Sequence, residues 1–206
     1  LVHETEETLA GRYNRGMIRA LRDGDIDYVF VMQGNTVADE EMLAALVRVA
    51  QRDPESGVLA PQVRLADKPD CLWSIGIQFR RMPPSTKNIG RGRPAEQYAR
   101  SRELEFAAAS GLLISREALE KAGLFDPGFG CYYEDLDFSR RVRNEGFRIR
   151  LVPEAKLFHR ETGAVRGADQ AEAWGESFIR FYRRHMKPLW MTIPVHFFYL
   201  LVREAL

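Results

Sequence analysis

The sequence predicts an α/β fold in which a mostly parallel sheet is flanked by helices. Tyr28–Met32 is a continuous run of apolar, β-branched and aromatic residues, as expected of a strand buried on both faces. A helix with apolar residues at helical spacing follows over 39–50, and Val58–Ala60 forms a short second strand closed by Pro61. This order of strand, loop, helix and strand is typical of a βαβ unit. Ligands of such sheets bind beyond the strand ends, where the turn Gln33–Thr36 lies.

The rest of the chain continues this alternation. Helices are predicted over 4–21 after an initial turn, 116–122, 134–145 and 172–184, and strands over 72–79 with a break at Gly76, 105–115 in two segments around Gly111, 148–152 and 156–159. The stretch Arg80–Arg102 is expected to be a long loop with seven basic residues. Two interpretations of it stay open: a solvated loop, or a contact for an acceptor or a phosphate.

Composition excludes several classes of protein. The chain has 206 residues, of which 45% are hydrophobic and 29% charged, as in a soluble globular domain. A net charge of +1 gives no reason to expect nucleic-acid binding. Cys71 and Cys131 are the only cysteines and form no CxxC pair, so neither a disulfide scaffold nor a zinc site is expected, and a reducing, cytosolic setting fits best.

The two ends of the chain carry separate expectations. The chain opens at Leu1 without Met and enters a helical pattern almost at once, which suggests a piece of a longer protein. Near the other end, 189–202 is apolar but is interrupted by Pro194 and His196, and it is shorter than the roughly 20 residues of a membrane span. A core helix, an interfacial membrane segment and a docking surface all fit it. The basic and aromatic stretch before it favours the interfacial segment.

The most distinctive stretch is Phe125–Arg141, which reads FDPGFGCYYEDLDFSRR. A turn-rich, aromatic lead-in brings Glu134, Asp135 and Asp137 to the start of a helix. Acids are favoured at helix N-termini, and this explains one or two of them. It does not explain three acids beside two tyrosines. Adjacent residues point about 100° apart on a helix, so one of the first two carboxylates can face a cleft as a candidate general base.

These residues, with others in a fixed order, resemble the family 2 glycosyltransferases of bacterial polysaccharide synthesis, in particular a rhamnosyltransferase-like branch. The resemblance extends to about residue 185. Its pieces are Asn14-Arg15-Gly16, the strand Tyr28–Met32 with its turn, Gly111–Asp126, Tyr133-Glu134-Asp135-Leu136-Asp137 with Arg140, Gly146, and Val152-Pro153-Glu154-Ala155 leading to His159.

The resemblance implies a GT-A-type, Rossmann-like fold and an inverting transfer of a sugar, such as rhamnose, from a nucleotide-sugar to a glycan or lipid-linked acceptor. By this resemblance Asp135 is the general base and Glu134 its catalytic neighbour. Substrate contacts fall on Gly111, Tyr133, Asp137 and Arg140, and the donor diphosphate region on Asn14, Gln33, Asn35 and His159. The expected location is the cytoplasm, with peripheral contact at the inner face of the cell membrane.

The sequence departs from the family pattern at the metal motif. Where the family has a carboxylate, this chain has Gln33-Gly34-Asn35, and Mg²⁺ and Mn²⁺ prefer carboxylate oxygens. Asn35 and His159 are the remaining candidate ligands, so metal binding is expected to be weak or absent.

The second departure is length. The family's first strands, which hold the nucleotide base, are expected to be missing before Leu1. The expected organisation is a catalytic-domain fragment over 1–185 and an apolar helical segment over 186–206.

Two other hypotheses follow from the same residues. A degenerate glycosyltransferase-like domain could keep the fold as a binding or scaffold module, which the missing metal acid favours. An unrelated doubly wound domain could use the acids for helix capping. The joint presence of Glu134-Asp135, Asp137, Arg140 and His159 argues against the second.

Overall fold

The computed structural model describes residues 8–81, 84–129, 132–161 and 168–186. The strands are β1 (Tyr28–Met32), β2 (Thr36–Ala38), β3 (Ser56–Leu65), β4 (Leu72–Ser74), β5 (Ile77–Arg81), β6 (Pro84–Asn88), β7 (Arg102–Glu103), β8 (Gly111–Ser115) and β9 (Arg148–His159). The helices are α1 (Leu9–Leu21), α2 (Met42–Arg52), α3 (Arg116–Ala122), α4 (Glu134–Asn144) and α5 (Ala168–His185), with a short 3-10 turn at Ala95–Tyr98.

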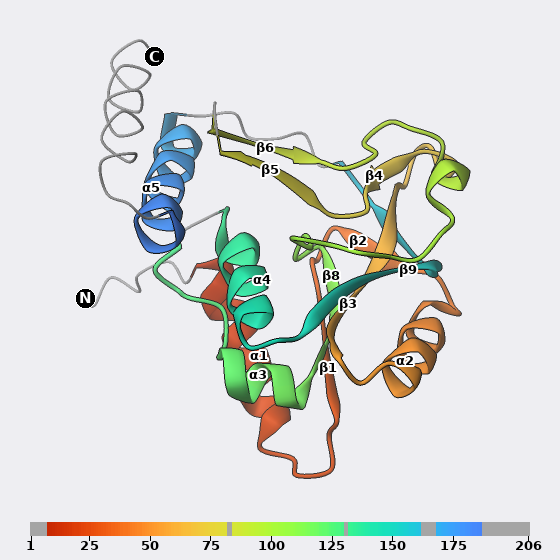
Figure 1. Ribbon diagram of the computed structural model, residues 1–206. Coiled ribbons are helices and arrows are strands. Elements are labelled where there is room, and N and C mark those ends of the chain that lie inside the picture. Colours follow the sequence, from red (N-terminus) through yellow and green to blue (C-terminus); the bar gives the residue numbers. More distant parts are fainter. Residues whose placement is uncertain (1–7, 82–83, 130–131, 162–167, 187–206) are drawn as a thin grey trace, which may run out of the picture.

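A seven-stranded sheet forms the centre of the molecule (Figure 1). Its strand order is β1-β8-β3-β9-β2, with β4 paired to β3 and β7 paired to β9. The strands β5 and β6 form a separate hairpin. The predicted α/β class is confirmed.

Strand pairing corrects the expectation of a mostly parallel sheet. Among the described strands, only β3 and β9 pair in parallel. The strands β1, β3 and β9 do run in one direction, but β8 lies antiparallel between β1 and β3. The chain reaches β8 from β3 through short strands and loops instead of a crossover helix, and it therefore enters the sheet in the opposite direction.

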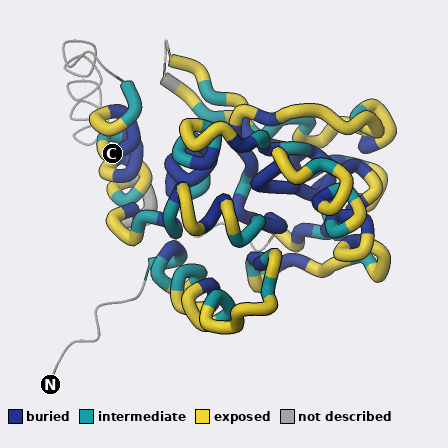
Figure 2. Tube along the Cα trace, turned by 60° about the horizontal axis from the view of Figure 1, so that its bottom comes forward, coloured by how far each residue is buried: buried dark blue, intermediate teal, exposed yellow. Residues whose placement is uncertain are grey.

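Alternation along the strands gives the sheet two apolar faces. On β8, Leu112 and Ile114 belong to the core under α1, α3 and α4, whereas Leu113 belongs to the core under α2. The helix α2 therefore covers one face of the sheet, and α1, α3 and α4 cover the opposite face (Figure 1). Buried backbone runs through the centre of the molecule in Figure 2, and exposed residues lie on the loops and outer helix faces.

A third apolar cluster joins α5 to the hairpin and to the start of α4. It contains Ile77, Phe106, Phe129, Tyr133, Leu136, Phe178, Phe181 and Tyr182. The Tyr182 hydroxyl also donates a hydrogen bond to the Arg81 carbonyl at 3.1 Å. This cluster fixes the helix that begins with the acid-rich sequence.

Several local expectations were wrong. The strand predicted at 58–60 runs on through Pro61, and one strand, β9, replaces the two predicted around Pro153, because the β3–β9 register shifts near both prolines. The predicted long loop contains β6 and the 3-10 turn. Only the second segment of 105–115 is a strand, and the short β2 was not predicted. The apolar segment 186–206 lies almost wholly outside the described residues.

Candidate active site

The acid-rich helix α4 begins after two residues with left-handed backbone conformation. Tyr132 has a φ of 68° and Tyr133 a φ of 65°. Non-glycine residues rarely adopt such angles, and each costs on the order of 1–3 kcal/mol unless the surroundings hold it. The surroundings of Tyr133 are the rings of Trp174, Phe178 and Phe181. Packing of one tyrosine thus sets the direction in which the first carboxylates of α4 project.

Asp135 is the carboxylate held toward the interior of the site. Its two oxygens accept hydrogen bonds from the backbone N–H of Ala109 at 3.2 Å and of Leu136 at 2.9 Å. Burial raises the pKa of Asp135 to about 6, and these backbone donors oppose the rise. A fixed, half-buried carboxylate with this pKa is ionised at neutral pH and basic enough to accept a proton.

Glu134 has the opposite character although it is the adjacent residue. Only 5% of it is exposed, and its Oε2 atom has no hydrogen-bond partner in the described part of the chain. Burial, followed by the negative charge of Asp135, raises the pKa of Glu134 to about 8. The two carboxyl groups titrate as a pair, and at neutral pH the charge lies on Asp135.

The helix α1 contributes Tyr13 and Asn14 to the surroundings of Asp135. The Tyr13 hydroxyl donates to the carbonyl of Ala109 at 2.9 Å, so Ala109 receives Tyr13 on one side and donates to Asp135 on the other. Burial and the nearby carboxyl pair raise the pKa of Tyr13 well above its usual value. Asn14 bonds both the carbonyl and the N–H of Phe125, at 2.7 and 3.1 Å, and so fastens α1 to the segment that leads to α4.

A cleft of about 510 Å³ lies between the start of α1 and the turn after β1. Its lining consists of Leu9, Arg12, Tyr13, Met32, Gln33, Gly34 and Asn35. Tyr13 belongs both to this cleft and to the surroundings of Asp135. The cleft that the predicted donor residues Gln33 and Asn35 line is therefore connected to the predicted base through Tyr13 and Ala109.

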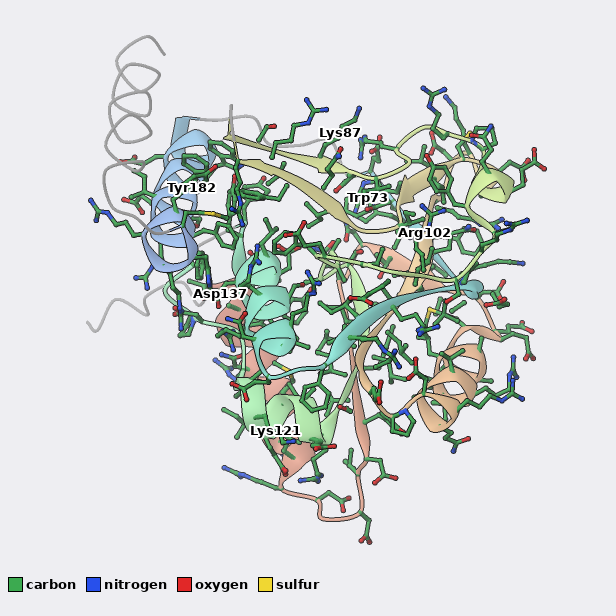
Figure 3. All side chains as sticks on the ribbon, in the orientation of Figure 1. Trp73, Lys87, Arg102, Lys121, Asp137 and Tyr182 are labelled. Atoms are coloured by element: carbon green, nitrogen blue, oxygen red, sulfur yellow. The ribbon has the colours of Figure 1, made fainter. Side chains whose placement is uncertain are left out.

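His159 lies beside the same turn. Its Nε2 atom is 3.3 Å from Asn35 Nδ2, and its ring stacks on Trp73 with centroids 4.2 Å apart. Trp73 belongs to β4, where Figure 3 labels it. Burial is the main cause that lowers the pKa of His159, so the ring is neutral at pH 7. Because Asn35 Nδ2 can only donate, Nε2 is the acceptor and Nδ1 carries the proton.

These residues fit a divalent cation poorly. Asn35 and His159 come together as predicted, but neither brings a negative charge. In the described ranges, no group of three or more His, Cys, Asp or Glu side chains could hold a metal ion. Asn35 could offer a cation only its neutral Oδ1 atom, because its Nδ2 donates to the Arg160 carbonyl at 3.2 Å. Hard cations prefer several oxygen ligands, mainly carboxylates.

The residues predicted to contact substrate differ in their environments. Asp137 is fully buried and pairs with Arg141 Nε and His185 Nε2, each at 2.8 Å. Gly111 lies within β8, where an added Cβ would come within 2.5 Å of Leu157 Cδ2. Arg140 pairs with Glu105 at 3.1 Å and lies over the Phe106 ring. In this structure these residues and the buried Tyr133 make packing and ion-pair contacts around the site. Their contact with a substrate stays a prediction.

Sequence reasoning missed three parts of the site. Tyr13 and Arg12 immediately precede Asn14, so a helical projection of that segment would have placed them near it. Trp73 gave no signal, because an aromatic residue in a strand usually belongs to the core. The backbone N–H of Ala109 has no side-chain signature at all.

Comparison with known proteins identifies the family. Residues 3–186 match the family described as "Glycosyltransferase like family 2", and the chain belongs to this family. It is 24% identical over 170 residues to N-acetylglucosaminyl-diphospho-decaprenol L-rhamnosyltransferase of Mycobacterium tuberculosis, a match that covers 70% of this chain and 50% of the relative. It is also 26% identical over 190 residues to hyaluronan synthase 3 of Xenopus laevis, covering 84% of this chain and 32% of that protein.

A solved structure gives the same fold. GalNAc-T7 with UDP, GalNAc and Mn²⁺ superimposes with a TM-score of 0.65 at 14% identity, covering 87% of this chain and 35% of that chain. This likeness confirms the predicted GT-A-type architecture. The chain spans about half the length of the rhamnosyltransferase that it matches. Among the described residues, no helix is long and apolar enough to cross a membrane.

Proposed function

We propose that this chain carries the acceptor-activating site of an inverting sugar transferase that uses a nucleotide-sugar donor. One observation carries the proposal: Asp135 is a fixed carboxylate with a pKa raised to about 6, and Ala109 and Tyr13 connect it to a cleft large enough for a ligand. A sugar hydroxyl is a poor nucleophile and needs such a base. The family membership supplies the class of reaction.

In the proposed transfer, Asp135 and Glu134 supply the acid–base chemistry. Asp135 removes the acceptor hydroxyl proton while that oxygen forms a bond to the anomeric carbon. The bond from the anomeric carbon to the diphosphate breaks, and its electron pair leaves with the diphosphate. Attack from the face opposite the leaving group inverts the anomeric centre. Protonated Glu134 beside Asp135 avoids a second negative charge at the base.

The rhamnosyltransferase relative suggests the finer assignment. We propose a rhamnosyl donor and a lipid-linked sugar diphosphate or glycan acceptor, as in the synthesis of cell-surface polysaccharides. The hyaluronan synthase relative keeps other sugars open for the test.

A panel of nucleotide-sugars tests this proposal on the full-length protein, with lipid-linked and glycan acceptors supplied. We expect release of one nucleoside diphosphate, with a product of inverted configuration. Asp135→Asn should lower transfer by about 100-fold or more, because it removes the base, and should leave donor affinity unchanged. The matched control is Asp25→Asn, which changes an exposed acid after α1 and should transfer normally.

The second candidate function is a binding module that has lost catalysis. The missing carboxylate at Gln33-Gly34-Asn35 favours it. Binding of a nucleotide-sugar with no release of nucleotide, in a folded protein supplied with acceptor, would support this module and overturn the transferase.

A further inference from the structure

In the cleft between α1 and the Gln33–Asn35 turn, the negative charge of a leaving diphosphate would need a partner. A diphosphate that leaves from an anomeric carbon gains negative charge, and a site must stabilise it. In this chain the turn that should hold a cation offers Gln33, Gly34 and Asn35, all neutral. The following inference rests on the proposed function, because only a nucleotide-sugar donor brings a diphosphate here.

Arg12 is the charged residue in the lining of this cleft. It lies in the first turn of α1, where its backbone N–H bonds the Thr8 carbonyl at 3.0 Å. Its side chain is exposed and faces the space that Gln33, Gly34 and Asn35 border on the other side. Within the part of the chain that the structure describes, the Arg12 guanidinium has no hydrogen-bond or ion-pair partner.

We propose that the cleft between α1 and the Gln33–Asn35 turn binds the donor's diphosphate through the Arg12 guanidinium and without a divalent cation. The chain thus carries an internal positive charge where a metal would otherwise lie. When the anomeric bond breaks, the electron pair stays on the leaving oxygen, and the guanidinium stabilises that charge.

The chemistry of the lining fits a diphosphate. A guanidinium presents a planar fork of N–H donors that matches two phosphate oxygens at once. None of the described residues that line the cleft carries a carboxylate that would repel an anion. The side-chain amide of Gln33 can add a neutral N–H contact. The first turn of α1 contributes partial charge of the same sign.

The position also fits the direction of transfer. Arg12 adjoins Tyr13, and Tyr13 reaches Asp135 through Ala109. The negative charges of the carboxyl pair and the positive charge of Arg12 both reach Tyr13, the first raising and the second lowering its pKa. A donor with its diphosphate at Arg12 can thus place its sugar toward the base.

Direct titration of nucleoside diphosphates tests the inference on the full-length protein. Calorimetry with UDP, dTDP and GDP would be run in EDTA and again in Mn²⁺. At least one diphosphate is expected to bind in EDTA, with an affinity that Mn²⁺ changes less than about threefold. Arg12→Gln is expected to weaken this binding by about tenfold or more, whereas the corresponding nucleoside should bind both proteins equally.

Two further variants make the loss interpretable. Arg12→Lys keeps the charge without the fork and should fall between wild type and Arg12→Gln. Arg19→Gln removes the same charge from an exposed position two turns later on α1, outside the cleft, and should bind normally. Thermal unfolding of each variant should match wild type, because both arginines are exposed.

The outcomes separate this inference from the proposed function. Binding that disappears in EDTA and returns with Mn²⁺, or that is unaffected in Arg12→Gln, would overturn the role of Arg12 and leave the transferase standing. Failure of every diphosphate to bind in either condition would overturn the nucleotide-sugar proposal, and this inference with it.

Discussion

Two adjacent carboxyl groups at the start of α4 differ in pKa because their surroundings differ. Asp135 has two backbone N–H donors, and Glu134 keeps an oxygen without a partner in the described structure. The N–H donors favour the ionised form of Asp135, whereas burial and the charge of Asp135 favour the protonated form of Glu134. The pair therefore supplies one base and one neutral neighbour.

The pH dependence of transfer follows from this difference. A general base works only when deprotonated, so kcat/KM should rise as the pH passes about 6 and level off above it. In Glu134→Gln the rise should stay near the same pH, because burial is the main cause of the Asp135 shift. Initial rates from pH 5 to 8 measure both profiles. A flat wild-type profile would contradict the assignment of Asp135.

Among the site residues, those with chemically distinctive side chains were the predictable ones. Glu134, Asp135, Asn35 and His159 were proposed from the sequence, and the structure places the first two on α4 and brings the last two together beside the β1–β2 turn. The part played by the Ala109 N–H could not be found, because every residue type except proline supplies a backbone donor. The stacking of Trp73 on His159 depends on strand packing that the sequence does not state.

At the scale of elements, an ion-pair cluster joins α4 to α5. Asp137 on α4 is fully buried and contacts Arg141 on its own helix and Arg184 and His185 on α5. Figure 3 shows Asp137 on the side of α4 near α5. The guanidinium of Arg141 continues the cluster to the carbonyls of Ala122 and Leu124. The third acid of the distinctive stretch therefore ties elements together.

Removing this acid should destabilise the protein. Asp137→Asn leaves Arg141 without its charged partner, and loss of one member of a buried pair costs about 3 kcal/mol. The free energy of unfolding in urea measures the loss. The matched control is Arg143→Gln, which breaks the exposed pair with Glu103 and should cost about 1 kcal/mol or less. Equal effects of the two substitutions would remove the structural role of Asp137.

Helices were easier to predict than strands in this chain. The helix predicted at 116–122 begins and ends as expected, because Ser115 caps it and Gly123 ends it with a φ of 74°. The hairpin of β5 and β6 was predicted only in part: most of β5 lies within the strand expected at 72–79, whereas β6 was mistaken for part of a loop. Its apolar contacts are made by Phe79 with α5, which is distant in the sequence.

At the scale of the whole molecule, sequence patterns predicted the relative direction of two strands but not the order in which the strands pair. The βαβ pattern correctly placed β1 and β3 in one direction. Nothing within Gly111–Ser115 indicates that this strand would enter between them, because a buried strand has the same apolar pattern in either direction. The connection over residues 66–110 brings β8 to its place beside β3, and its course is beyond the reach of local periodicity.

The pH dependence of global stability combines these buried acids. For Asp137 the pKa is lowered in the folded state, by His185 and Arg141 against the effect of burial, so its contribution is present above about pH 4 and is lost as the pH falls through the folded pKa. For Glu134 and Asp135 the folded pKa is raised, so the folded protein holds protons that the unfolded chain has released. Stability should therefore be greatest near pH 4, the unfolded pKa of these acids, and should fall as the pH rises toward about 8.

Urea unfolding at pH 5 and at pH 8.5 tests this balance. Wild type is expected to be less stable at the higher pH, and Glu134→Gln should lose less between the two, because it cannot acquire the buried charge. Glu117→Gln changes an exposed acid on α3 and should follow wild type. A wild-type protein equally stable at both values would show that the carboxyl pair is not held in a dry site. The proposed division between a charged base and a neutral neighbour would then lose its physical cause.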